Sequence, residues 1–264
     1  MGKLTFQITG YLNYKYKAIN VHHLHSPFAY DLVKNVVNNK QRNPDYKKIN
    51  SLRKQLQGDS SDIEVTDFGA GVGNQEHSTY LKNVSAIFKN NSIQTKYGEL
   101  LYRLVKHLHP THILELGTSL GISTAYMALA APEASITTVE GCKGIAEKAA
   151  ENFVKLGIKN IHQEIGNFDN ILAPIINDIP KIDFAFIDGN HRKEPTIRYF
   201  ESCLQKSHND TVLIFDDIHW SEDMNEAWNI ICSHKSVTLT LDIFQFGIVF
   251  FKKELSKQDF IISY

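Results

Sequence analysis

Downstream of Gly117 the chain alternates between short β-branched apolar runs and longer amphipathic stretches of helical length. This alternation is typical of a doubly wound parallel sheet, in which each strand is followed by a helix that packs on a face of the sheet. The predicted fold class is therefore α/β and Rossmann-like. The pattern predicts strands at 112–116, 136–140, 161–165, 182–187 and 211–215, and helices near 121–131, 143–157, 168–177, 193–206 and 221–233.

The end of the chain has a different pattern. The runs VTLTLD (237–242) and FQFGIVFFKK (244–253) are both strand-like, and the connection between them is too short for a helical crossover. We expect them to form an antiparallel pair at the end of the sheet. Five parallel strands and this pair predict a sheet of seven strands.

The chain before residue 110 reads as mainly helical. In HSPFAYDLVKNVV, Ser26 stands at an N-cap position and Pro27 at the first helical position, and only IEVTDF (63–68) looks like a strand. No repeat and no low-complexity linker separates this region from the rest. We therefore predict a helical cover segment over residues 1–95, packed on a sheet domain over 96–264.

Composition narrows the class of protein. The hydrophobic fraction of 42% and charged fraction of 22% are those of an ordinary globular protein, and no stretch is apolar enough to span a membrane. The N-terminus is interrupted by polar residues before an apolar signal core could form, which favours a cytoplasmic location. The three cysteines are odd in number and without a C-x-x-C pair, which argues against a disulfide framework.

The net charge of -1 hides two unlike halves. Residues 1–110 hold 15 Lys and Arg against 8 Asp and Glu (15 − 8 = +7), whereas 111–264 hold 13 against 21 (13 − 21 = −8). A basic half can bind nucleic acid, but these charges form no compact Lys/Arg run. Packing of oppositely charged surfaces, within the chain or between the subunits of a homodimer, explains the asymmetry without requiring a nucleic-acid ligand.

Two glycine loops follow apolar runs that end in an acid: VTDFGAGVGN (65–74) and ILELGTSLGIS (113–123). A loop that binds an adenosyl cofactor needs a strand to aim it, glycines that let the backbone approach, and an acid at the end of the next strand for the ribose. Only the second loop has all three, since Glu140 ends SITTVE 23 residues after Gly117 (140 − 117). The glycines of the first loop, Gly69, Gly71 and Gly73, are interpreted as a turn or cap.

The second loop departs from the dinucleotide fingerprint G-x-G-x-x-G. Ser119 stands in the place of the middle glycine, which disfavours close approach of the backbone to a pyrophosphate. A cofactor without phosphates fits better, and this points to S-adenosylmethionine and away from NAD.

The stretch LLYRLVKHLHPTHILELGTSLGISTAYMALA, followed by VEG, resembles the first motif of class I S-adenosylmethionine-dependent methyltransferases, particularly the catechol and caffeoyl-CoA O-methyltransferase branch. The resemblance covers residues 96–251 and implies an S-adenosylmethionine-binding methyltransferase domain acting on a small-molecule acceptor. In it, Glu115 and the loop line the methionine portion, Glu140 accepts from the ribose and GNFD (166–169) contacts the adenine. The implied cofactor-binding residues are Glu115, Gly117, Thr118, Ser119, Gly121, Ser123, Glu140, Gly141, Asn167, Phe168 and Asp188.

Acidic residues also end the next two strands: Asp188 follows FAFI, and Asp216 and Asp217 follow VLIF. Carboxylates gathered at one edge repel one another unless a cation or a basic group joins them, and a hard divalent ion is the natural partner. The resemblance implies a metal held by these three residues, with Asp217 where that branch has Asn. The alternative is that they serve as helix cap, backbone contact and solvated side chain.

Proton transfer has two candidates. Where the resembling branch has a Lys three residues after the first metal-binding Asp, this chain has His191, with Lys193 two residues further on. A histidine has a suitable unperturbed pKa to accept a proton from an acidified hydroxyl. We therefore predict His191 and Asp188 as catalytic residues, with a solvent-facing helix start as the alternative for His191.

Other classes fit less well. GTSLG satisfies the hydrolase elbow G-x-S-x-G with Ser119 as nucleophile, but the several preceding strands that this elbow requires are missing. NPDY (43–46) faintly resembles a motif of amino-group methyltransferases, yet it precedes the cofactor loop. An RNA methyltransferase that uses the basic half, and a methyltransferase-like binding module without catalysis, remain as alternatives. The sequence does not identify the acceptor.

Overall fold

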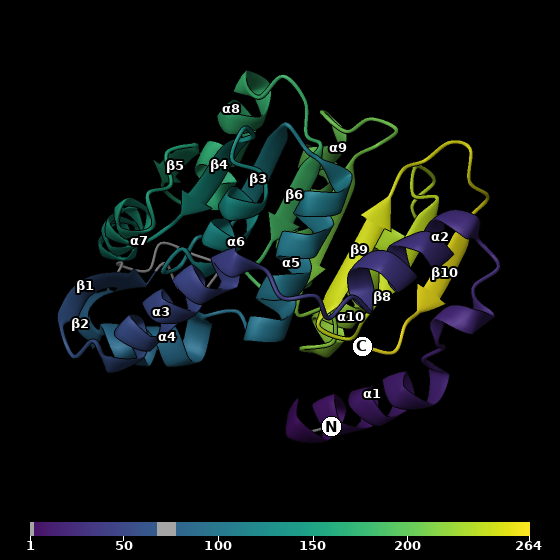
Figure 1. The fold of residues 1–264 in the computed structure, drawn as a ribbon, viewed down its shortest axis with the longest axis horizontal. Coiled ribbons are helices and arrows are strands. Elements are labelled where there is room, and N and C mark those ends of the chain that lie inside the picture. The colour runs from purple at the N-terminus through teal and green to yellow at the C-terminus, as the bar shows by residue number, and fades with distance from the viewer. Residues whose placement is uncertain (1–2, 68–77) are drawn as a thin grey trace. The chain divides into compact units, whose positions relative to one another are not determined.

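The computed structural model describes residues 3–67 and 78–264, in two compact units. The first unit holds residues 1–39 and 173–264, and the second unit holds residues 40–172. Figure 1 labels the elements of each. The predicted functional boundary at residue 95 is a different kind of division, and it stays a prediction.

The second unit contains three parallel strands, β3 (His112–Leu116), β4 (Ser135–Glu140) and β5 (Ile161–Ile165), in the order β3-β4-β5. All three predicted strands are confirmed, and β3 and β5 have the predicted bounds. Burial is nearly complete along β3, as expected for a strand covered on both faces. The helices of this region are α3 (Pro44–Gly58), α4 (Val84–Asn91), α5 (Thr95–Leu108), α6 (Ile122–Ala130), α7 (Lys143–Leu156) and α8 (Phe168–Asp178), of which α8 continues past residue 172.

The second unit also carries a separate antiparallel pair, β1 (Asp62–Asp67) and β2 (Ser78–Asn83). The strand predicted from IEVTDF is confirmed. Its partner STYLKN was not predicted, because its two apolar residues, Tyr80 and Leu81, are adjacent and so give no alternation; both are exposed. Gly69, Gly71 and Gly73, which were interpreted as a turn or cap, lie outside the described residues.

The first unit contains five strands in the order β10-β8-β9-β7-β6. β6 (Phe184–Ile187) and β7 (Val212–Asp216) are parallel, and β9 (Phe246–Phe250) is antiparallel to both β7 and β8 (Leu239–Asp242). The predicted antiparallel C-terminal pair is confirmed. β10 (Gln258–Ile261) pairs with β8 in parallel and was not predicted. Apart from the β1–β2 pair, the described residues therefore form three strands in the second unit and five in the first, which is one more than the seven expected.

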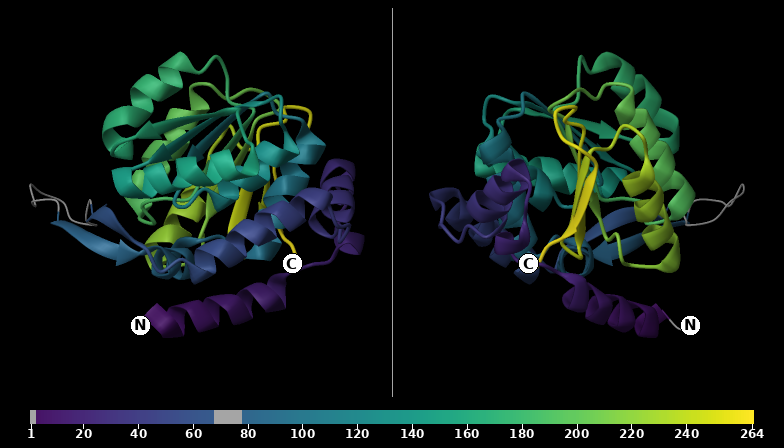
Figure 2. Two further views of the ribbon diagram at one scale, coloured as in Figure 1. Left: turned by 60° about the vertical axis from the view of Figure 1, so that its left-hand side comes forward. Right: turned by 90° about the vertical axis from the view of Figure 1, so that its right-hand side faces the viewer.

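Helices cover both faces of the strands in the first unit. α9 (Lys193–Leu204) and α10 (Glu222–Ser233) lie on one side of the C-terminal strands, and α2 (Pro27–Leu32) lies on the other (Figure 2). The ring of Phe28 on α2 packs edge-on against Phe250 on β9 at 5.2 Å between centroids. Ser26 caps α2 as predicted, since its hydroxyl accepts from the Ala29 N–H at 3.4 Å.

The first helix, α1 (Lys3–Lys17), is tied to the end of the chain within the first unit. The Tyr14 hydroxyl donates to the Ile262 carbonyl at 2.7 Å and accepts from the Tyr264 N–H at 3.1 Å. Ile19 bridges to Ile262 in parallel. Burial raises the pKa of Tyr14 to about 12, so its hydroxyl keeps its proton and can donate at neutral pH.

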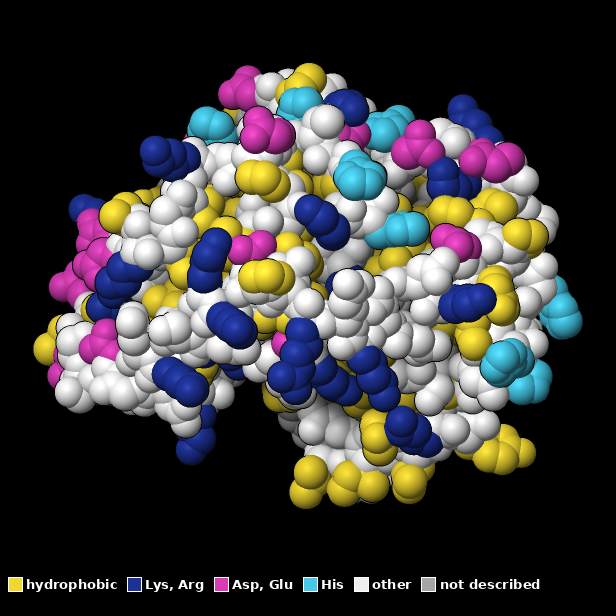
Figure 3. Space-filling view, in the orientation of Figure 1, with side chains coloured by type: hydrophobic (Ala, Val, Ile, Leu, Met, Phe, Trp, Pro, Cys, Tyr) yellow, Lys and Arg dark blue, Asp and Glu magenta, His cyan; other side chains and the backbone are white. Residues whose placement is uncertain are grey.

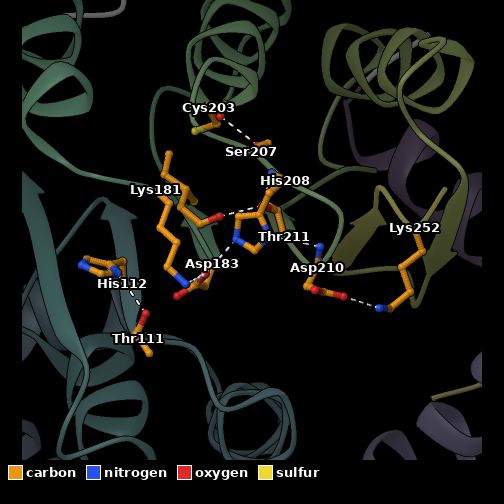
Figure 4. Close-up of polar contacts among 11 residues, drawn as sticks. Thr111, His112, Lys181, Asp183, Cys203, Ser207, His208, Asp210, Thr211 and Lys252 are labelled. Carbon is orange, nitrogen blue, oxygen red and sulfur yellow. Dashed lines mark hydrogen bonds and ion pairs between the residues drawn. The ribbon is translucent and has the colours of Figure 1, made fainter.

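Figure 4 shows paired charges around the start of β6 and β7. Asp183, just before β6, lies 2.8 Å from Lys181 Nζ and 2.8 Å from His208 Nε2. Asp210, just before β7, lies 2.6 Å from Lys252 Nζ. These pairs surround the start of the two strands whose other ends carry the carboxylates predicted as catalytic (Asp188) or metal-binding (Asp188, Asp216 and Asp217).

Candidate active site

The loop after β3 adopts a backbone that few residues tolerate. Gly117, Ser119 and Gly121 have φ values of 101°, 47° and 80°, all in or near the left-handed region. A Cβ on Gly121 would lie 2.5 Å from Cε1 of Phe153 on α7. Glycine is therefore required at 121 both by conformation and by space. The loop leads directly into the N-terminus of α6, as predicted.

Glu140, at the end of β4, holds this loop through backbone N–H groups. Its Oε2 accepts from the Ser119 N–H at 2.8 Å and its Oε1 from the Cys142 N–H at 2.9 Å. Burial raises the pKa of Glu140, and the bonds from Cys142, Ser119 and Gly141 oppose that rise. Each oxygen can accept further bonds, so the carboxylate fits a ligand that presents hydroxyl groups.

Glu115 lies beneath the loop and is fully buried. Its Oε2 accepts from Thr124 on α6 at 2.5 Å and from Thr138 on β4 at 2.6 Å. Burial raises the pKa of Glu115 to about 7, while the bonds from Ser123, Thr124 and Thr138 lower it. This carboxyl therefore joins β3, β4 and α6 below the loop, and its predicted contact with the methionine portion stays a prediction.

Asn167 and Phe168 follow β5. The Asn167 side chain accepts from the Asp169 N–H at 2.9 Å, and Phe168 begins α8. The Gly166 N–H donates to the Glu140 carbonyl at 2.9 Å, which joins this turn to the end of β4. Within the second unit, the predicted cofactor residues accordingly follow the carboxyl ends of three neighbouring strands, where ligands of such sheets bind.

In the first unit, three aspartates meet at the ends of β6 and β7. Asp216 Oδ1 accepts from the Asp217 N–H at 2.8 Å, and the Asp216 carboxyl is also hydrogen-bonded to Asp188. Burial, then repulsion from Asp217, raises the pKa of Asp216 to about 7. The juxtaposition predicted from the sequence is therefore present, and Asp188, Asp216 and Asp217 are called the carboxylate cluster below.

Gln245 joins this cluster and was not predicted. Its Nε2 donates to Oδ1 of Asp216 and to Oδ1 of Asp217, at 2.6 Å each. It stands in FQFG, at the start of the last antiparallel hairpin strand, where a single polar residue between two phenylalanines was the available signal. The register of β9 against β7, Phe246 opposite Asp216, brings it there.

His191 lies beside the cluster as well. Its Nε2 is 3.5 Å from Oδ1 of Asp188 and 3.9 Å from Oδ2 of Asp217. Lys193, by contrast, forms an ion pair with Glu226 on α10 at 2.6 Å, which raises the pKa of Lys193. Of His191 and Lys193, it is therefore His191 whose side-chain nitrogen lies near the carboxylate cluster.

His219 is held on both ring nitrogens. Nε2 lies 2.7 Å from Asp242 and Nδ1 3.1 Å from Asn225. Over the residues that the structure describes, no group of three or more His, Cys, Asp or Glu side chains has an arrangement that could hold a metal ion. The three aspartates predicted as metal ligands are close together, and a metal bound by them stays a prediction.

Comparison with known proteins gives the class. A family model described as a methyltransferase domain matches residues 114–218, from β3 to just beyond Asp217. These residues are therefore similar to methyltransferase domains. The resemblance to class I S-adenosylmethionine-dependent methyltransferases that was drawn from the loop and Glu140 is thus confirmed.

The fold of the methyltransferase domain agrees with solved structures. The O-methyltransferase TomG from Streptomyces achromogenes, in complex with S-adenosylmethionine, has a TM-score of 0.57 at 17% identity over 80% of this chain and 91% of that one. An O-methyltransferase from Bacillus cereus, in complex with S-adenosylhomocysteine, has a TM-score of 0.56 at 17% identity over 83% of this chain and 93% of that one. The α/β Rossmann-like class is confirmed.

Among curated relatives, catechol O-methyltransferase of Niastella koreensis is 29% identical over 130 residues, which are 48% of this chain and 58% of that enzyme. The match spans little more than half of the relative. In the described part of the chain, no helix of the methyltransferase domain or its flanks is long and apolar enough to cross a bilayer.

Proposed function

We propose that this protein transfers the methyl group of S-adenosylmethionine to an oxygen of a small molecule. The observation that carries the proposal is Glu140: a carboxylate at the end of β4, held by the N–H groups of Ser119 and Cys142 beside a loop with three unusual φ angles. This is the arrangement that an adenosyl ribose requires. The names of the O-methyltransferase relatives and structural neighbours support oxygen as the acceptor.

The cofactor is assigned to the residues that the sequence predicted. Glu140 and Gly141 take the ribose, and Asn167 and Phe168 take the adenine. The loop from Gly117 to Gly121 and Ser123 take the methionine portion, with Glu115 fixing the loop from below. Asp188, at the end of β6 in the first unit, is also predicted from the sequence as a cofactor contact. Among the residues that the structure describes, none is a hydrogen-bond partner of Oε1 of the buried Glu115 carboxyl, and a cofactor amino group is a suitable donor to it.

The chemical step needs a deprotonated acceptor oxygen near the sulfonium methyl group. His191 Nε2 takes the proton from the acceptor hydroxyl, and Asp188 and Asp217 stabilise the imidazolium that forms. The oxygen then attacks the methyl carbon in line, the carbon–sulfur bond breaks, and its electron pair stays on sulfur to give S-adenosylhomocysteine. His191 is the proposed base, and Asp188 is its partner.

We further assign a divalent cation to the carboxylate cluster. The donor chemistry fits, because Asp188, Asp216 and Asp217 offer hard oxygen ligands, and burial together with repulsion from Asp217 already raises the pKa of Asp216. The Gln245 amide, which now donates to two of these carboxylates, can offer its oxygen to a cation after a half-turn. A bound cation would lower the pKa of the acceptor hydroxyl.

The test of the cofactor assignment is calorimetric titration with S-adenosylhomocysteine. Glu140→Ala removes a charged hydrogen-bond acceptor, so we expect the affinity to fall by about 10- to 100-fold. The matched control is Glu147→Ala, which removes an exposed glutamate of α7 that pairs with Lys143. Equal affinities of the two variants would remove Glu140 from the site, and a folded wild type that binds no S-adenosylhomocysteine would overturn the proposed function.

A further inference from the structure

Helix α7 has two contrasting faces. Figure 3 shows Lys, Arg, Asp and Glu side chains together at the left-hand edge of the view, where α7 lies in Figure 1. The inner face is apolar apart from one residue: of the buried side chains that the structure describes on α7, only that of Asn152 is polar. Ala149 and Phe153 share this face and lie against the Gly117–Gly121 loop, since a Cβ on Gly121 would be 3.4 Å from the first and 2.5 Å from the second. Asn152 therefore belongs to the surface on which the loop packs.

Asn152 is also bonded to the loop. Its Nδ2 donates to the Leu120 carbonyl at 3.0 Å. The preceding residue, Ser119, donates its N–H to Oε2 of Glu140 at 2.8 Å. Two side chains thus hold neighbouring residues of the loop, one through a backbone N–H and the other through a backbone carbonyl.

The loop needs such contacts because Ser119 has a left-handed backbone, with a φ of 47°. This conformation is unfavourable for a residue that carries a Cβ. The hydroxyl of Ser119 does not compensate for it, since its Oγ is buried and has no hydrogen-bond partner among the described residues. The bonds to Glu140 and Asn152 flank the strained residue, so they are placed to maintain its conformation.

Packing alone does not explain an amide at position 152. Asn152 is fully buried, and none of the residues that the structure describes is a hydrogen-bond partner of its Oδ1. A desolvated oxygen without a partner lowers stability, whereas a leucine of similar size and branching would not bury one. The bond from Nδ2 to Leu120 is therefore the contribution that distinguishes Asn152 from an apolar residue.

We propose that Asn152 is a positioning residue for the cofactor site. Its amide fixes the Leu120 carbonyl, and with it the left-handed backbone at Ser119, so that the loop has the shape that S-adenosylmethionine requires. Asn152 acts through the loop and does not itself contact the cofactor. This inference rests on the proposed function and adds to it a residue of α7 that the sequence did not single out.

Two asparagines of the second unit provide a matched test. Asn160, just before β5, donates to the Ala131 and Ala134 carbonyls at 3.1 Å and 2.9 Å, so it holds backbone carbonyls at the other end of the strands. Asn152→Leu should lower the affinity for S-adenosylhomocysteine about tenfold in calorimetric titration, because the strained loop loses one of its contacts. Asn160→Leu should lower the unfolding temperature and leave that affinity unchanged. Equal losses of affinity in the two variants would overturn the proposal.

Ser119→Gly tests how Asn152 acts. Glycine adopts a left-handed backbone without strain, so a loop with glycine at 119 should depend less on Asn152. In the Ser119→Gly background, Asn152→Leu should lower the affinity for S-adenosylhomocysteine by about threefold or less, against about tenfold where Ser119 is present. Losses of the same size in both backgrounds would contradict a role through the backbone of Ser119.

Asn152→Asp is the conservative variant. A buried carboxyl favours its protonated form, whose O–H can donate to the Leu120 carbonyl, whereas the carboxylate cannot. Compared with the wild type at the same pH, the affinity of Asn152→Asp for S-adenosylhomocysteine should be similar at about pH 5 and should fall towards about pH 8. A loss of about tenfold already at the lower pH would contradict the proposal, and this comparison does not require Asn152→Leu to fold.

Hydrogen exchange, followed by NMR, reports on the loop without a cofactor. The Ser119 N–H should exchange at least about tenfold faster in Asn152→Leu than in the wild type, and at the wild-type rate in Asn160→Leu. If the wild type binds S-adenosylhomocysteine and Asn152→Leu binds it equally well, the inference fails alone. If the wild type binds none, the proposed function fails, and an unchanged exchange rate of Ser119 would then overturn the positioning role of Asn152 as well.

Discussion

The two ends of β6 and β7 carry similar numbers of carboxylates in opposite surroundings. At the start of the strands, Asp183 and Asp210 each lie within 2.8 Å of a basic side chain. At the other end, Asp216 is bonded to an amide, a backbone N–H and a neighbouring aspartate. The bond from Lys252 lowers the pKa of Asp210. Burial, then repulsion from Asp217, raises the pKa of Asp216 although these hydrogen bonds oppose the rise.

This difference separates a structural from a functional use of the same residue type. The charge of a carboxylate that is paired with a basic side chain is already compensated, so that carboxylate needs no further ligand. Carboxylates that lie close together destabilise the folded state by their repulsion. Such a cluster is expected where a bound substrate, proton or cation compensates the charge. The comparison therefore supports the proposal that the chemistry takes place at the carboxyl ends of the strands, whereas the pairs at the other end stabilise the fold.

The largest expected effect is on turnover. Asp216→Asn keeps the size of the side chain but removes a carboxylate from the cluster, so we expect kcat/KM to fall by about 100-fold or more. Asp210→Asn makes the same chemical change at the start of the same strand and should leave kcat/KM unchanged. Initial rates of both variants, over a range of acceptor concentrations, show which end of β7 turnover depends on. A loss of kcat/KM that is the same in both variants would contradict the distinction.

The same pair of variants tests the cation without turnover. Mg²⁺ is expected to raise the unfolding temperature of the wild type and of Asp210→Asn, and not that of Asp216→Asn, because a ligand stabilises only the state that binds it. Identical shifts in all three proteins, or full activity of the wild type in excess chelator, would contradict a cation at the cluster.

The second expected effect is on stability against pH, measured in chelator. Asp216 has a pKa near 7 in the folded state against an ordinary value of 3.8, so between these values the folded state holds a proton that the unfolded state releases. Stability then falls as the pH rises from 4 to 7, by up to about 1.4 kcal/mol per pH unit, and levels off above 7. Asp216→Asn should lose this contribution, which urea midpoints at pH 5 and pH 8 would show.

Asp210 should act with the opposite sign. Its pKa is lowered by Lys252, so its contribution to stability is full above the ordinary value of 3.8 and is lost as the pH falls through the lower folded value. Asp210→Asn should therefore differ from the wild type equally at pH 5 and pH 8. A difference that changes between these two values would mean that the two ends are not electrostatically distinct.

Much of this fold was predictable because the local hydrophobic pattern indicates most of the parallel strands. HILEL and IHQEI were placed at their observed bounds, and Glu140 was assigned a role from its position at the end of SITTVE. The three aspartates could be brought together from the sequence because parallel strands end at one edge. These inferences need only the period of the pattern and the geometry of a βαβ unit.

What the sequence did not reveal depends on distant contacts. Gln245 reaches Asp216 through the register of β9, and Tyr14 reaches Ile262 across 248 residues. β10 has a mixed pattern, QDFI, that becomes a strand because β8 offers a free edge for it. Tertiary pairing decides such elements, and no local propensity distinguishes them beforehand.

The smallest expected effect concerns the ion pair of Asp210 with Lys252. Asp210 is 68% exposed and Lys252 is 20% exposed, so solvent screens most of their attraction and Asp210→Asn should cost about 0.5 kcal/mol or less. Lys252 also lies over the Phe28 ring, 5.3 Å from its centroid, so Lys252→Met should cost somewhat more, up to about 1 kcal/mol. Urea unfolding of both single variants and the double variant, at low and high salt, would separate the two contributions. High salt screens the ion pairs of Lys252 with Asp210 and with Glu254, which lies 3.6 Å from Lys252 Nζ. The part of the difference between Lys252→Met and Asp210→Asn that comes from the contact with Phe28 should therefore persist in high salt, and disappearance of the whole difference would assign the effect of Lys252 to charge pairing alone.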